Sequence, residues 1–92
     1  MQLKDTIQLM NSENYKDRFV AEYLQLIVRI KGLEKMLVKY RCGKLNFTPK
    51  CSYELLKAQL KTMEDYKFYL EIRAKIEGIE LRGYKIWMKK IF

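Results

Sequence analysis

The sequence has no histidine, one proline, four glycines and two cysteines in its 92 residues. Without histidine it lacks the commonest general acid or base at neutral pH, and two cysteines alone cannot supply the four ligands of tetrahedral zinc. It also has no glycine-rich phosphate loop and no GxSxG turn. These absences predict a protein that is not an enzyme and that uses no metal or cofactor.

Long apolar segments are missing as well. No stretch approaches the roughly 20 apolar residues that span a bilayer, and the start of the chain lacks the apolar core of a signal peptide. We therefore expect a cytoplasmic protein. In a reducing cytosol, Cys42 and Cys51, which flank the expected turn, should be free thiols rather than a disulfide.

The composition is that of one folded domain. Hydrophobic residues make up 49% of the chain and charged residues 33%, which argues against disorder. A chain of this length rarely divides into two cores. We assign residues 1–81 to a single helical-hairpin domain and treat 82–92 as a separate tail.

One long segment repeats its apolar residues at alternating spacings of four and three. The members of this seam are Phe19, Tyr23, Leu26, Ile30, Leu33, Leu37 and Tyr40. Such a heptad pattern predicts a helix, here over about residues 13–41. Asn11, Ser12 and Asn14 are candidate N-caps, and Asp17, three residues after Asn14, suits the positive end of the helix.

A second helix is expected after a short turn. The segment between Cys42 and Ser52 contains Gly43 and Pro49 and is too short for another element, so the next helix must run back antiparallel. Ser52 is its predicted N-cap, and the helix is expected over about residues 52–81, with Gly83 as the cap beyond it and Gly78 as an alternative, earlier end. Its apolar positions are Leu56, Leu60, Met63 and Leu70, followed by a drift to Tyr69, Ile72, Ile76 and Ile79.

The hairpin carries more apolar residues than two facing stripes can bury. Val20, Leu24 and Ile27 lie beside the seam of the first helix, and the second helix has a wide apolar arc. A short N-terminal helix over residues 3–10 is expected to pack either on the hairpin of the same chain or on a neighbouring hairpin. We predict an all-α fold, a short N-terminal helix followed by a long antiparallel helical hairpin, that assembles as an oligomeric helical bundle.

The segment 82–92 mixes aromatic and basic residues. Arg82, Lys85, Lys89 and Lys90 supply half of the net charge of +8. The segment is too short to be a stable helix alone, so we expect it to strap onto a neighbouring protomer. Contact with an anionic membrane surface or with a nucleic-acid backbone is the alternative.

Tyrosines and cations occur together in two places that the hairpin brings to the same end. Aromatic rings stack on nucleobases and guanidinium groups bind phosphates, so this end is suited to a nucleotide. The candidate ligand-binding residues are Tyr15, Lys16, Arg18, Tyr69, Arg73 and Lys75. The alternative is that the tyrosines are interface residues and the lysines only solvate the surface.

The polar positions of residues 11–81 carry a family resemblance. Tyr-Lys-Asp-Arg-Phe opens the first helix, Glu-Tyr follows before the seam, and Gln59, Met63 and Tyr66 recur in the second helix. The pattern resembles small helical-hairpin proteins encoded by bacteriophages, including the crAss-like phages. These are similar to the anti-CBASS and anti-Thoeris nucleotide sponges.

The resemblance implies a homo-oligomer, such as a hexamer, in the host cytoplasm. It would bind a cyclic oligonucleotide or cyclic ADP-ribose signal of bacterial immunity without cleaving it, and Tyr15 would match an early tyrosine that stacks the base. We assign Arg18, Arg73 and Lys75 to phosphates from the residues alone. Two other functions stay open: a basic nucleic-acid-binding protein, and a protein-binding inhibitor of a host defence enzyme.

Overall fold

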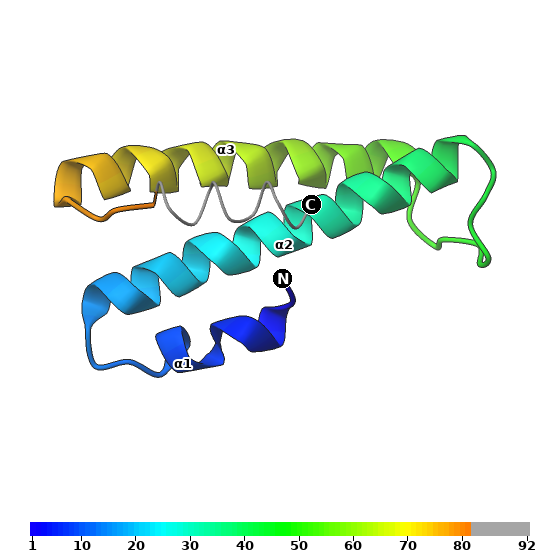
Figure 1. Ribbon diagram of the computed structural model, residues 1–92. Coiled ribbons are helices and arrows are strands. Elements are labelled where there is room, and N and C mark those ends of the chain that lie inside the picture. The colour runs from blue at the N-terminus through cyan, green and yellow to red at the C-terminus, as the bar shows by residue number, and fades with distance from the viewer. Residues whose placement is uncertain (82–92) are drawn as a thin grey trace.

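The computed structural model describes residues 1–81, so the predicted tail lies outside the described residues. Four helical segments follow in order: the 3-10 helix η1, Leu3–Thr6, and the α-helices α1, Ile7–Met10, α2, Tyr15–Arg41, and α3, Tyr53–Glu77. The two long helices form an antiparallel hairpin, and the N-terminal segment lies beside α2 (Figure 1). The predicted all-α class, with a short N-terminal helix and a hairpin, is confirmed for this part of the chain.

The start of α2 is fixed by a network of short polar side chains. The Asn14 side chain accepts a hydrogen bond from the Lys16 amide at 2.8 Å, as an N-cap does. Ser12 Oγ donates to the Asp17 carboxylate at 2.8 Å and accepts from the Asn14 amide at 3.0 Å. This network lets the chain turn from α1 into α2 with its backbone donors satisfied.

The second long helix begins where predicted and ends earlier. Ser52 Oγ accepts from the Leu55 amide at 3.1 Å, and this cap starts α3. The helix stops at Glu77 rather than near residue 81 because Gly78 takes the left-handed conformation, with φ of 72°. The Ile79 amide then donates to the Ala74 carbonyl at 2.8 Å, which turns the chain back towards α2.

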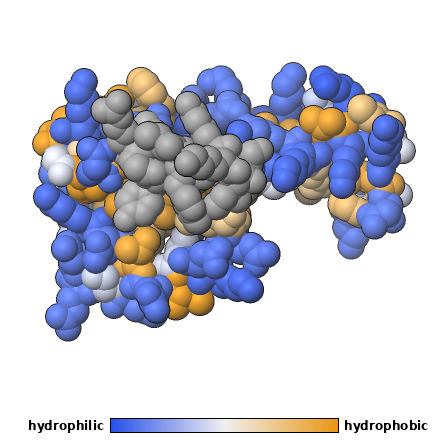
Figure 2. Space-filling view, in the orientation of Figure 1, coloured by the Kyte–Doolittle hydropathy of each residue, from blue (hydrophilic) through white to orange (hydrophobic). Residues whose placement is uncertain are grey.

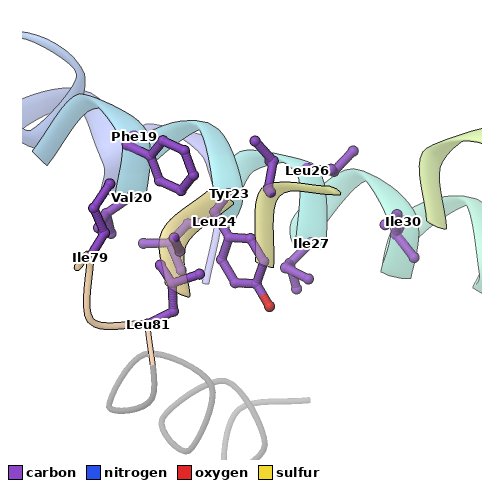
Figure 3. Packing of buried hydrophobic residues seen from close by; sticks show 11 residues of the cluster. Phe19, Val20, Tyr23, Leu24, Leu26, Ile27, Ile30, Ile79 and Leu81 are labelled. Atoms are coloured by element: carbon purple, nitrogen blue, oxygen red, sulfur yellow. The ribbon is translucent and has the colours of Figure 1, made fainter. Parts of the chain in front are cut away.

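The core lies in the half of the hairpin away from its loop. Its buried members are Phe19, Val20, Tyr23, Leu24, Leu26, Ile27, Ile30, Leu70, Ala74, Ile79 and Leu81. Ile79 lies beside Val20, and Leu81 lies beside Leu24, so the segment after α3 closes one side of this core (Figure 3). Only two residues of α3, Leu70 and Ala74, are buried.

The N-terminal segment packs on the hairpin of the same chain. It does so through the side that carries Thr6 and Leu9, not through the side that carries Ile7 and Met10. Thr6 is fully buried, and its hydroxyl accepts a hydrogen bond from the Gln25 side chain of α2 at 2.9 Å. Leu9 packs against the core, whereas Ile7 and Met10 are about half exposed. A polar residue therefore anchors this segment, because the side chain of Gln25 satisfies its buried hydroxyl.

Much apolar surface remains on the outside of α3. Phe68, Tyr69 and Ile76 are 58%, 63% and 79% exposed, respectively. Hydrophobic side chains reach the surface on the hairpin and on the N-terminal segment in the face shown in Figure 2. Within residues 1–81, no helix is both long enough and apolar enough to cross a membrane.

Candidate functional site

A polar and aromatic cluster lies at the end of the hairpin opposite the loop. We call it the Tyr15 cluster; it consists of Tyr15 and Phe19 of α2 and Arg73 and Glu77 of α3. The Arg73 guanidinium donates from one Nη to the Tyr15 hydroxyl at 2.8 Å and from Nε to the Glu77 carboxylate at 3.2 Å. Its Cζ lies 5.1 Å from the centre of the Phe19 ring, a cation–π distance.

Each of these side chains is placed by the helix that carries it. Tyr15 and Phe19 are one turn apart on α2, and their ring centres are 6.3 Å apart in an edge arrangement. Arg73 and Glu77 are likewise one turn apart on α3, a spacing that favours an ion pair. Phe19 is buried and Tyr15 is 47% exposed. The cluster is therefore fixed to the core through Phe19 and accessible to a ligand at Tyr15.

The two charged residues of the cluster act on the pKa of Tyr15 in opposite directions, and the pKa is raised overall. The Glu77 carboxylate favours the protonated phenol and raises the pKa of Tyr15, while Arg73 acts in the opposite direction. The two hydrogen bonds of Arg73 use two of the five N–H groups of a guanidinium. Arg73 therefore keeps donors that can bind a phosphate, although Glu77 offsets part of its charge.

Tyr69, another predicted site residue, lies close to this cluster along α3. It precedes Arg73 by one helical turn, so the two side chains lie on the same side of α3. Its ring is 63% exposed and is tilted against Phe68, with the ring centres 6.1 Å apart. Tyr69 is therefore an accessible ring on the same side of α3 as Arg73.

Within residues 1–81, no hydrogen bond or ion pair joins the other predicted site residues to this cluster. Arg18 donates to the Ser12 carbonyl at 2.8 Å, so its guanidinium helps to hold the turn before α2. Lys75 borders a different groove, which it shares with Phe68, Ile79 and Glu80. Lys16 is exposed and contributes its backbone amide to the helix cap.

Sequence reasoning missed two members of the cluster. Phe19 was assigned to the apolar seam alone, although a ring one turn after Tyr15 is placed to support a cation. Glu77 was not considered, although its spacing of four from Arg73 is the signal of an ion pair. Both could have been found from helical spacing once Arg73 was chosen.

The fold and the Tyr15 cluster together define a small helical-hairpin protein with a site suited to binding. A sequence model of the Sequestin family matches residues 13–76, which include all of α2 and most of α3. The chain belongs to this family. The name of the family suggests that a molecule is sequestered, and so indicates binding rather than catalysis. Neither the curated proteins nor the solved structures that were compared give a match.

Proposed function

We propose that this protein is a phage anti-defence protein that sequesters a cyclic nucleotide signal of bacterial immunity, without cleaving it, in the host cytoplasm. The observation that carries the proposal is the Tyr15 cluster in a member of the Sequestin family. The Tyr15 ring stacks on a base, and the remaining donors of Arg73 bind a phosphate. Sequestration lowers the free signal, so the host effector stays inactive.

The chemistry of the cluster supports reversible binding. Rings with accessible faces and a guanidinium hold a nucleotide through contacts that break again when the protein unfolds. The Tyr15 hydroxyl is neutral and engaged with Arg73, which makes it a poor nucleophile. The bound nucleotide should therefore leave the protein chemically intact.

The test is a binding panel of cyclic dinucleotides, cyclic trinucleotides and cyclic ADP-ribose isomers. A ligand should raise the melting temperature, because binding at a hundredfold excess over Kd adds about 2.7 kcal/mol to the free energy of unfolding. Mass spectrometry after denaturation should recover the ligand unchanged. If no member of the panel changes the melting temperature, the proposal is wrong.

Two substitutions test whether the ligand binds at the Tyr15 cluster. Arg73→Gln should weaken binding by about tenfold or more, since a hydrogen bond to a charged group is worth about 1.5–3 kcal/mol. Arg29→Gln removes the same charge from an exposed site on α2 and should leave the affinity within about twofold. Equal losses in both variants would indicate diffuse attraction to a basic surface, as expected of a nucleic-acid binder.

A further inference from the structure

A second groove lies at the other end of the hairpin, beside the loop. Its α2 side includes Gly32, Lys35 and Lys39, which follow one face of the helix, and its loop side includes Lys44 and Phe47. The groove has a volume of about 490 Å³. Lys35 is about 30 Å along α2 from Tyr15, at 1.5 Å per residue, so this loop groove is separate from the Tyr15 cluster.

The end of α2 folds the loop onto the helix and so forms the groove. Gly43 has a φ of 69°, which a glycine adopts without strain. Its amide donates to the Tyr40 carbonyl at 3.2 Å, and the Lys44 amide donates to the Lys39 carbonyl at 2.8 Å. These two bonds are a Schellman motif, which brings residues 44–47 back over α2.

The lining of the loop groove is cationic and partly aromatic. Three of its lining residues are lysines, Phe47 is 54% exposed, and Asn46 adds a polar side chain to the lining. Within residues 1–81, no carboxylate forms an ion pair with Lys35, Lys39 or Lys44, and the nearby Glu34 is paired with Lys31 at 3.6 Å. Three neighbouring ammonium groups without a counter-charge favour a ligand with several negative charges.

We propose that the loop groove binds a linear nucleoside polyphosphate, with its phosphates on the three lysines and its base against Phe47. Ammonium groups are established phosphate ligands, and an accessible phenyl ring provides a stacking surface for a base. The ligand differs in class from the cyclic nucleotide assigned to the Tyr15 cluster. The inference therefore goes beyond the proposed function and does not depend on it.

The test is a titration followed by the backbone amide signals of the ¹⁵N-labelled full chain at about 0.15 M salt, where weak surface attraction is screened. ATP, ADP, AMP, adenosine and inorganic tripolyphosphate are the probes. Signals of residues 35–47 should move, and the affinity should fall from ATP to AMP, with no binding of adenosine. Phe47→Leu should weaken the binding of ATP at least threefold and leave the binding of tripolyphosphate unchanged. This result would distinguish a nucleotide site from a site for phosphate alone.

Gly32 offers a variant that blocks the groove without altering its charge. A Cβ atom added at Gly32 has no atom of another part of the chain within 4 Å, and leucine has a higher helix propensity than glycine, so Gly32→Leu should fold. Gly32→Leu should weaken the binding of ATP at least tenfold. The double variant that combines Lys39→Gln with Lys44→Gln should weaken it to the same extent. Lys50→Gln, in the loop but outside the groove lining, is the matched control and should change the affinity less than twofold.

The possible outcomes separate the two sites. If the loop-groove variants lose ATP binding while Arg73→Gln retains it, the second site is established, whatever ligand the Tyr15 cluster binds. The proposal is overturned if ATP moves no signals in residues 35–47. It is also overturned if Gly32→Leu binds ATP as tightly as the parent protein, or if Lys50→Gln is weakened as much as the double lysine variant.

Discussion

At the scale of single residues, the best-defined polar contact in the core joins the two long helices. Tyr23 is 1% exposed and donates to the Glu71 carboxylate of α3 at 2.7 Å. Burial raises the pKa of Tyr23, and the hydrogen bond to Glu71 raises it further. Tyr23→Phe should lower the free energy of unfolding at neutral pH by about 1.5 kcal/mol in urea titrations.

The same residue predicts how stability responds to alkaline pH. Below the ordinary tyrosine pKa of about 10, the phenol is protonated in both states and its contribution is complete. Above that pH the unfolded chain releases the proton while the folded chain retains it, so the free energy of unfolding falls as pH rises. Tyr23→Phe should show a smaller fall above pH 10 than the parent protein. Parallel curves would contradict this assignment.

Glu77 sets the electrostatics of the Tyr15 cluster. Its carboxylate raises the pKa of Tyr15 and pairs with the guanidinium that we assign to a phosphate. Glu77→Gln should lower the pKa of Tyr15, measured by NMR titration of labelled tyrosine, and should tighten binding of an anionic ligand severalfold. Glu64→Gln, which removes an exposed carboxylate elsewhere on α3, is the control and should do neither.

At the scale of elements, the end of α3 depends on Gly78. Alanine in the left-handed conformation is strained, so Gly78→Ala should lower the free energy of unfolding by about 1–2 kcal/mol. The loss should be larger if the return of Ile79 and Leu81 to the core is disturbed. Gly32→Ala, in the interior of α2, should instead stabilise by up to about 1 kcal/mol, because alanine favours helix. If urea titrations gave the same change in the free energy of unfolding for both variants, the left-handed conformation at Gly78 would not be needed to end α3.

Periodicity predicted α2 better than α3, for a physical reason. The heptad seam correctly selected Phe19, Tyr23 and Ile30 as buried, because α2 contacts both α3 and the N-terminal segment along that side. On α3 the apolar residues form two stripes, and spacing alone cannot tell which of them meets α2. Leu70 is buried, whereas Ile76 is the most exposed large apolar residue within residues 1–81.

The candidate site was only partly predictable for a similar reason. Antiparallel pairing is enough to bring the start of α2 near the end of α3, and the structure places Tyr15 against Arg73. Which way a long side chain turns depends on nearby partners that helical spacing does not specify. Arg18 turns to the Ser12 carbonyl, and Lys75 faces a different groove. The loop groove was missed because the segment from Cys42 to Ser52 was predicted only as a short turn, and its fold back over α2 depends on the conformation of Gly43.

At the scale of the whole molecule, one hairpin leaves a large part of its apolar surface in water. The outer side of α3 presents Phe68, Tyr69, Ile72 and Ile76, all at least 39% exposed, over about two helical turns. Such a continuous apolar surface usually marks an interface, and helices pack along stripes of this kind. We therefore still expect further copies of the chain to cover this side of α3.

Sedimentation velocity and native mass spectrometry test this expectation directly. The purified protein should run as a discrete oligomer, and Ile76→Glu should shift it towards the monomer, because a charge at a residue that is 79% exposed in the single chain would be buried between copies. The same side chain should hardly affect the helix content of the monomer. Gln8→Glu adds an equal charge on α1, away from α3, and should leave assembly unchanged. A parent protein that stays monomeric would contradict the expectation that copies of the chain cover α3.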